Sequence, residues 1–230
     1  MANLPINFRN SGEGAIATYT YTDIAAGTGV QTFYAATAPS GTNFLTDKQI
    51  YSDIVFLSRE CPLFTLQTTE GGASALVDYD FDVTFNLPRS IKGDCFVEIP
   101  EGIRKTAVGA SNTFQRMHAY IRKWNGSTET NLVSMSGSIW DSGSGSATKT
   151  NLTVLNGNIP LTHFKKGETL RLTIQDRTWN VGQDYALLFF GVDPQGRLTS
   201  DNSKVSGGAL TFATGDPTAL RLFIPFRIDL

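Results

Sequence analysis

Charged residues are scarce in this sequence of 230 residues. Asp, Glu, Lys and Arg make up 17% of the chain, against roughly 25% in an average soluble domain, and the net charge is −2. A chain without a positive excess lacks the field that gathers nucleic acid or anionic membrane, so we expect neither as a partner. Few charges would have to be desolvated, so the surface is suited to lie against protein.

Cysteines and long apolar runs are scarce as well. Cys61 and Cys95 are too few for a disulfide framework. The sequence shows neither the charged and apolar segments of a signal peptide nor the roughly 18 consecutive apolar residues of a membrane helix. We therefore expect a protein made in the cytoplasm of its host, not secreted by a signal peptide, with both cysteines as buried free thiols.

Patterns typical of enzymes and cofactor sites are lacking too. His118 and His163 are the only histidines, no Gly-x-Ser-x-Gly surrounds a serine, and neither a phosphate-binding loop nor a zinc-ligand spacing occurs. Nucleophilic catalysis requires a base beside the nucleophile. We expect no catalytic residue, no cofactor and no metal, and hence a protein that is not an enzyme.

Strict alternation of apolar and polar residues is the clearest feature that the sequence does contain. Leu76–Asn86 and Gln115–Lys123 both alternate with a period of two, which places their apolar side chains on one face of a sheet. Asn125-Gly126 follows the second run, and this pair favours a tight hairpin turn. The chain should therefore return as a strand through roughly Thr130–Ser136.

Shorter runs of the same kind predict further strands. They cover Ile16–Tyr21, Val30–Ala36, Gln49–Leu57, Cys95–Ile99, Asn151–Leu155, Glu168–Ile174, Tyr185–Val192 and Leu222–Asp229. Tyr185–Val192 is nearly all apolar, as expected of a central strand, whereas Pro225 lacks an N–H and predicts an edge strand. The only helical signal is one turn at Leu161–Lys166. The spacing predicts an all-β fold, an antiparallel β-sandwich of jelly-roll type.

The first residues differ from the rest of the chain in their pattern of apolar residues and glycines. Residues 1–14 carry alternating Leu4, Ile6 and Phe8 and then a Gly-rich joint, which predicts an N-terminal arm before a single sandwich domain of residues 15–230. The arm is a candidate interface because alternating apolar residues can add a strand to a neighbour's sheet edge. Packing across its own sandwich is the alternative.

An acidic row, Asp78, Asp80 and Asp82, lies on the polar face of its predicted strand. Carboxylates that neighbour one another on one face repel, so they face open water, collect a cation, or meet Arg or Lys of a neighbouring subunit. A flat strand offers no loop carbonyls, which argues against calcium.

The polar face of Gln115–Lys123 and the residue after it interleaves cations with aromatic rings. Its members are Arg116, His118, Tyr120, Arg122 and Trp124. Such a stripe could stack single-stranded nucleic acid or sugars, or it could form an inter-subunit contact, since Tyr, Trp and Arg are the enriched anchors of interfaces. An ordinary solvent face with cross-strand aromatic pairs is the third interpretation.

Four segments carry a resemblance to a known class of protein. They are Ala2–Phe8, the hairpin segment Ala17–Ile24, the strand–turn–strand segment Ile121–Thr130, and Phe164–Leu172. In style they resemble tailed-bacteriophage virion structural proteins with jelly-roll folds. The resemblance implies a capsid decoration (cement) protein in the virion that binds and stabilises the phage head, with the major capsid protein as partner and a homo-oligomer, most often a trimer. A tail or fibre-adaptor component and a carbohydrate-binding β-sandwich module are the alternatives.

Overall fold

The computed structural model describes residues 17–18, 28–38, 40–49, 55–61, 77–105, 112–144, 148–180, 186–195 and 212–227. All helix or strand structure in these ranges is β-strand, which confirms the all-β prediction. The strands are β1 (Ala17–Thr18), β2 (Thr28–Thr37), β3 (Asn43–Thr46), β4 (Val55–Cys61), β5 (Tyr79–Thr84), β6 (Arg89–Lys105), β7 (Thr113–Trp124), β8 (Glu129–Ser136), β9 (Trp140–Asp141), β10 (Thr148–Phe164), β11 (Thr169–Asn180), β12 (Ala186–Gly191) and β13 (Arg221–Arg227). No helix in the described ranges is long and apolar enough to cross a membrane.

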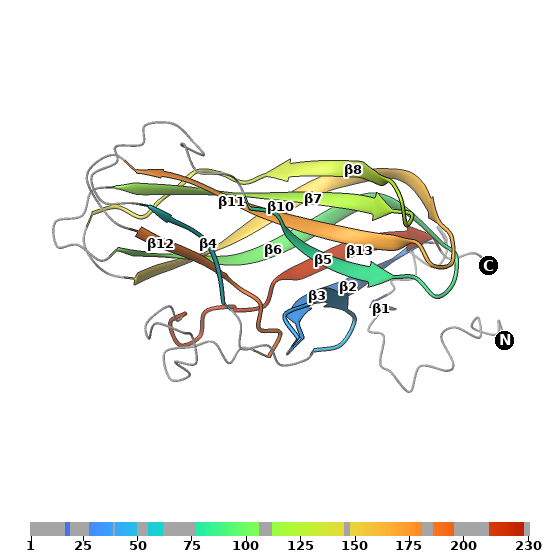
Figure 1. Cartoon of the computed structure of the whole chain (residues 1–230), viewed down its shortest axis with the longest axis horizontal. Helices are drawn as coiled ribbons and strands as arrows, with labels where there is room; N and C mark the ends of the chain where they lie inside the picture. The colour runs from blue at the N-terminus through green and yellow to red at the C-terminus, as the bar shows by residue number, and fades with distance from the viewer. Residues whose placement is uncertain are drawn as a thin grey trace.

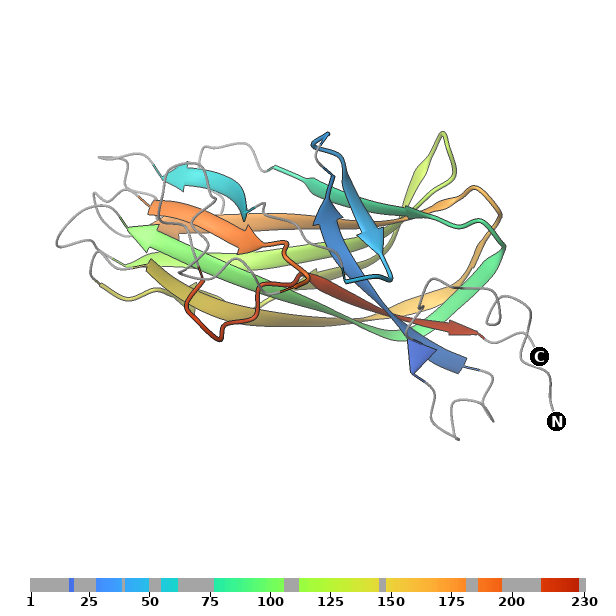
Figure 2. The same cartoon turned by 90° about the horizontal axis from the view of Figure 1, so that it is seen from below.

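The strands form a sandwich of two layers (Figures 1 and 2). In the first layer, β10 pairs along one edge of β6, while β12 and β13 share the other edge and lead to β4 and β2. In the second layer the order is β5, β11, β7 and β8. The layers are joined through β3, which pairs with β2 and makes one parallel contact with β5 between Phe44 and Asp82. Every other strand pairing among the described residues is antiparallel.

Three features predicted from the sequence are confirmed. Asn125-Gly126 turns between β7 and β8, and Gly126 has a φ of 97°, a conformation that glycine adopts without strain. β1 and β2 lie within or overlap the strands predicted at Ile16–Tyr21 and Val30–Ala36, and they pair with each other. β12 is flanked by β4 and β6, so the apolar run there is a central strand.

Two local predictions are wrong. β13 is not an edge strand, because it pairs with both β2 and β6. Its pairing with β6 is interrupted between Phe223 and Phe226, and this irregularity accommodates Pro225, which has no N–H to donate. The helical turn expected at Leu161–Lys166 is instead the end of β10, followed by a tight turn at Gly167.

Strand lengths were underestimated where polar residues interrupt the pattern. β6 and β10 each have 17 residues and pair along nearly their whole length, although only Cys95–Ile99 and Asn151–Leu155 were predicted. The strand expected at Gln49–Leu57 begins at Val55 in the described residues, and β3 was not predicted. A ladder of backbone hydrogen bonds to a long neighbour extends a strand beyond its own apolar residues.

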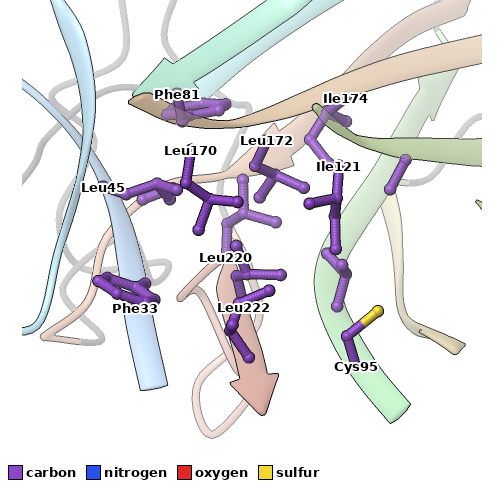
Figure 3. Close-up of a cluster of buried hydrophobic side chains, with 14 of the residues drawn as sticks. Phe33, Leu45, Phe81, Cys95, Ile121, Leu170, Leu172, Ile174, Leu220 and Leu222 are labelled. Carbon is purple, nitrogen blue, oxygen red and sulfur yellow. The ribbon is translucent and has the colours of Figure 1, made fainter. Parts of the chain in front are cut away.

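The core lies between the layers and is filled by side chains that alternate inward from both (Figure 3). Phe81, Ile121 and Leu172 enter it from the second layer, and Phe33 and Leu222 from the first. All five are at least 96% buried. The alternation of these residues in the sequence therefore identified the inward face of β5, β7, β11 and β13.

Cys95 is a buried free thiol, as expected. Its sulfur donates to the carbonyl oxygen of Gly157 at 3.2 Å, and burial raises the pKa of the thiol to about 11. A thiol with a raised pKa is a poor nucleophile and packs as a small apolar group. The Cys61 side chain lies outside the described residues.

The two layers approach each other closely where β10 runs beside β8. A Cβ placed on Gly157 would lie 2.6 Å from Val133 Cγ2 and 3.0 Å from Met135 Cγ. A glycine is required at this position because any side chain would push the layers apart. This contact closes one side of the sandwich and fixes the position of β10.

Candidate docking surfaces

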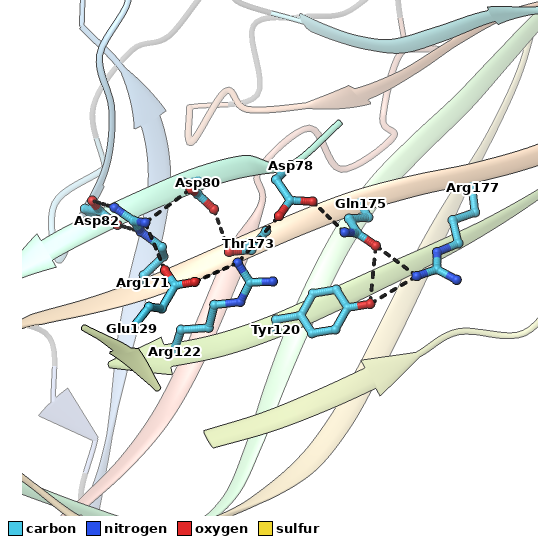
Figure 4. A network of polar contacts seen from close by, with 10 residues as sticks. All are labelled: Asp78, Asp80, Asp82, Tyr120, Arg122, Glu129, Arg171, Thr173, Gln175 and Arg177. Atoms are coloured by element: carbon cyan, nitrogen blue, oxygen red, sulfur yellow. Dashed lines mark hydrogen bonds and ion pairs between the residues drawn. The ribbon is translucent and has the colours of Figure 1, made fainter. Parts of the chain in front are cut away.

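The outward residues of β7 form the centre of a polar surface on the second layer. Burial alternates residue by residue along β7, and Arg116, His118, Tyr120, Arg122 and Trp124 are the half-buried outward set, as predicted. The residues opposite them on β11 are polar as well. With the outward side chains of β5 and β8 they form a surface that we call the charged face, whose bonded members are Asp78, Asp80, Asp82, Tyr120, Arg122, Glu129, Arg171, Thr173, Gln175 and Arg177 (Figure 4).

Arg171 pairs with the acidic row. Its Nε and Nη2 donate to the two carboxylate oxygens of Asp82, each at 2.8 Å, and its Nη1 lies 3.4 Å from Asp80 Oδ2. Arg171 is the cross-strand neighbour of Asp82, so the register of β5 and β11 brings them together. The fork geometry is the strong, bidentate form of an arginine–carboxylate pair.

Glu129 extends this pairing across the layer. One of its carboxylate oxygens accepts from Arg171 at 2.9 Å and the other accepts from Arg122 at 3.1 Å. Arg171 and Arg122 are directly opposite each other on β11 and β7, and the carboxylate between them offsets their repulsion. These partners, the hydrogen bond to Asp82 first, raise the pKa of Arg171 above its ordinary value.

The other carboxylates of the row are also bonded within the chain. The Thr173 hydroxyl donates to Asp80 Oδ1 at 2.6 Å, and the Gln175 amide donates to Asp78 Oδ1. Arg122 Nη1 lies 3.5 Å from Asp78 Oδ2. Arginines of this chain thus pair with the acidic row, for which Arg or Lys of a neighbouring subunit was one of the alternatives. In the described ranges no group of three His, Cys, Asp or Glu side chains is placed to hold a metal ion.

Both aromatic rings of the stripe carry an arginine over one face. The Arg122 guanidinium lies 4.9 Å from the centre of the Tyr120 ring, and that of Arg171 lies 5.9 Å from the centre of the Trp124 ring. Tyr120 is also fixed by its hydroxyl, which bonds to Gln175 at 3.3 Å. A base or sugar ring would have to compete with these cations for the ring face.

The outward surface of the first layer has the opposite character, and the sequence did not predict it. Its exposed apolar residues include Phe96 (44% exposed) on β6 and Leu152 (38%) and Val154 (55%) on β10. The half-buried Phe223 on β13 is the direct neighbour of Phe96. We call Phe96, Leu152, Val154 and Phe223 the apolar face. Leu152 and Val154 alternate as core residues do, but the register of β10 sends Leu155 and Ile159 into the core instead.

One ion pair lies within the apolar face. Arg221 Nη2 and Glu98 Oε2 are 2.5 Å apart on neighbouring strands. Glu98 is also the neighbour of Val154 on the other side. The two charges cancel, so the apolar face carries no net charge to oppose a partner.

A buried carboxyl group lies on the inner side of the same layer. Glu101 on β6 is 1% exposed; it accepts hydrogen bonds from the Asn151 amide at 2.7 Å and from the Thr153 hydroxyl, while its Oε2 has no partner. Burial raises the pKa of Glu101 to about 7, and the carboxylate of Asp176 adds to this effect. No sequence pattern pointed to this carboxyl group, because Glu101 follows Pro100 in a stretch with no predicted strand.

A serine and a histidine are also brought together. Ser90 Oγ and His163 Nδ1 lie 2.7 Å apart as cross-strand neighbours on β6 and β10. No carboxylate in the part of the chain that the structure describes bonds to His163, so the pair lacks the group that orients an imidazole for catalysis. His118 lies on the charged face, away from this pair. That the chain is not an enzyme stays a prediction.

The predicted arm lies outside the described residues, and with it Leu4, Ile6 and Phe8. β1 and its pairing with β2 are the first described structure. The interface expected of the arm, and that expected of the stripe on β7, both stay predictions.

Comparisons with known proteins show likeness to solved structures alone. No protein-family model and no curated protein matches the chain. Two structures of a CocE/NonD family hydrolase from Staphylococcus aureus match with TM-scores of 0.45 and 0.35, at 13% and 11% identity, over 92% and 85% of this chain. The chain spans 37% and 41% of those proteins. The Eiger TNF structure from S. frugiperda matches at 10% identity with a TM-score of 0.23, over 52% of this chain and 87% of that one. Scores this low carry no argument about function.

Proposed function

We propose that this chain is a non-enzymatic structural protein of a virion, a decoration protein that packs against capsid protein on the phage head. The virion setting comes from the resemblance described above. The observation that carries a packing role is the apolar face, where Phe96, Leu152 and Val154 stay 38–55% exposed on the neighbouring strands β6 and β10.

Energetics favour the apolar face over the charged face as the docking surface. Burying the exposed remainder of an apolar side chain of this size contributes about 1 kcal/mol, so Phe96, Leu152 and Val154 together contribute about 3 kcal/mol. Docking through the charged face would instead remove Arg171 and its carboxylates from water, at a cost of several kcal/mol for each ion that is not matched anew. The partner surface is expected to be apolar as well.

Purified virus particles provide the test. The chain should be present in a fixed ratio to the capsid protein, and Phe96→Lys should lower its incorporation at least tenfold, because a buried unpaired ammonium opposes docking. Ser136→Lys is the matched control, since Ser136 is exposed on β8 in the second layer and its substitution should leave incorporation unchanged.

Two results would contradict the proposal. Equal incorporation of Phe96→Lys and the unchanged chain would exclude docking through the apolar face. Absence of the chain from particles, together with strong binding on a glycan array that Trp124→Ala abolishes, would replace the virion role by that of a carbohydrate-binding module.

A further inference from the structure

One long strand at the side of the sandwich has an unused edge. β10 pairs with β6 from Thr148 to Phe164, and no other strand in the described ranges pairs with its second edge. The backbone groups of such an edge are available to another strand, and natural proteins commonly block them with charges, prolines or bulges.

β10 lacks these blocks over its central residues 150–158. Residues 150–158 read Thr-Asn-Leu-Thr-Val-Leu-Asn-Gly-Asn, with neither a charge nor a proline, and their pairing with β6 is continuous; the register shift comes only after Ile159. The strands at the two ends of the main strand order, β8 and β4, carry such blocks. β8 begins with Glu129 and its pairing with β7 is bulged, while β4 carries Arg59 and Glu60 and is bulged against β12.

We propose that β10 of a second copy of this chain pairs antiparallel with this edge, about a two-fold axis at Val154. In such a pair Val154 lies opposite Val154 of the second copy, and Leu152 lies opposite Asn156. In an antiparallel pair of identical strands, residues near the two-fold axis lie near their own copies, so a charge there would face a like charge and be repelled. Residues 150–158 carry no charge, so a second copy fits this edge without repulsion.

The contact also joins the two apolar faces. Val154 is 55% exposed and points outward from the layer, so the two copies of this residue become neighbours on one continuous sheet. An isologous contact of this kind produces a dimer rather than the trimer that the resemblance implies. The β10 contact does not depend on the proposed function. A dimer would present two apolar faces side by side, which would favour docking on a phage head.

Sedimentation velocity over a concentration series tests the contact. The unchanged chain should form a dimer, and Val154→Lys should raise the dissociation constant at least tenfold, because two ammonium groups would then face each other at the axis. Phe96→Lys is the matched control: Phe96 is exposed on the same outward surface but on β6, one strand away from the edge, so its variant should remain a dimer. Circular dichroism should show all three folded.

The same pair of variants separates this inference from the proposed function. Phe96→Lys should lose incorporation into particles and keep the dimer, whereas Val154→Lys should lose the dimer. A monomeric unchanged chain at all concentrations, or an undiminished dimer of Val154→Lys, would overturn the β10 contact and leave the docking proposal standing.

Cross-linking tests the register without a new charge. Residues opposite each other in an antiparallel pair have Cα atoms roughly 4.5–5.5 Å apart, which a disulfide can span. Val154→Cys should therefore yield a covalent dimer on mild oxidation, above the background of the unchanged chain. Ile139→Cys, at a residue that is 49% exposed and outside the strands, should not. No cross-link through position 154, or an equal yield from both variants, would overturn the register.

Discussion

On the charged face Arg171 contacts Asp80, Asp82 and Glu129, whereas on the apolar face Arg221 forms an ion pair with Glu98 and with no other residue that the structure describes. The partners of Arg171 come from β5 and β8, so its side chain links strands on both sides of β11 and β7. Arg221 links only β13 to its direct neighbour β6. An arginine therefore links several strands of the second layer on the charged face, but only two neighbouring strands on the apolar face.

The difference separates two tasks that a β-sandwich surface can perform. A dense network of charged hydrogen bonds holds the register of β5, β11, β7 and β8. The charged face stays hydrated because removing water from this network costs energy. Among the described residues, the first layer has its register held by the long ladder between β6 and β10 and by the ion pair of Arg221 with Glu98. Its outward surface is therefore free to carry apolar residues for a partner.

A carboxyl group buried between the two faces gives the largest expected effect. The pKa of Glu101 is raised from 4.5 to about 7, so between these values the folded chain keeps a proton that the unfolded chain has released. The folded state has its full advantage below pH 4.5 and loses it as the pH rises to about 7. The free energy of unfolding should fall by about 3 kcal/mol over this window, and urea unfolding of Glu101→Gln should lack this fall.

Glu98→Gln is the control for that measurement, because Glu98 points outward from the same strand. Its profile between pH 5 and 8 should keep the fall that Glu101→Gln removes. If the free energy of unfolding of the unchanged chain and of Glu101→Gln changed with pH in parallel, a charge would be tolerated inside the sandwich. Desolvation would then cost too little to explain why one face is charged and the other apolar.

Replacing Arg171 and Arg221 in turn tests directly whether the charged face contributes more to stability than the ion pair on the apolar face. Arg171→Met keeps the apolar stem but leaves Asp80 and Asp82 without their cation and Glu129 with Arg122 alone, so urea unfolding should show a loss of about 2 kcal/mol. Arg221→Met removes a single pair whose arginine side chain is 36% exposed, and the loss should stay below about 1 kcal/mol. Equal losses would mean that the network on the charged face adds nothing beyond its individual pairs.

The sequence predicted which residues share a face of a strand better than it predicted which strands are neighbours. Alternation placed Asp78, Asp80 and Asp82 on one side of β5, and Arg122 and Tyr120 on one side of β7, because the period of two is local. It could not show that Arg171 lies between these strands. That neighbour depends on the order β5, β11, β7, which pairing of distant segments decides.

The apolar face and the role of Pro225 could not be predicted for a related reason. Where a strand carries apolar residues on both sides, alternation does not say which side faces the core, and in β10 the sequence offers Leu152 and Val154 on one side and Leu155 and Ile159 on the other. Pro225 excludes one backbone hydrogen bond, and a bulge satisfied that condition as well as an edge would have. Both outcomes depend on packing between the layers.

Salt gives the smallest expected effect, and it acts on the two faces in different ways. Raising sodium chloride from 0.01 M to 1 M shortens the screening length from about 30 Å to about 3 Å, which weakens partly exposed ion pairs and leaves uncharged contacts alone. The free energy of unfolding should fall by about 0.5 kcal/mol in the unchanged chain and by less in Arg171→Met, which lacks the centre of the network. The dimer formed through the uncharged β10 edge should have the same dissociation constant within about twofold, because no ion pair forms across it. A dimer that dissociates tenfold more readily in 1 M salt would instead have an ionic contact, and the charged face would then be the surface at which copies of this chain meet.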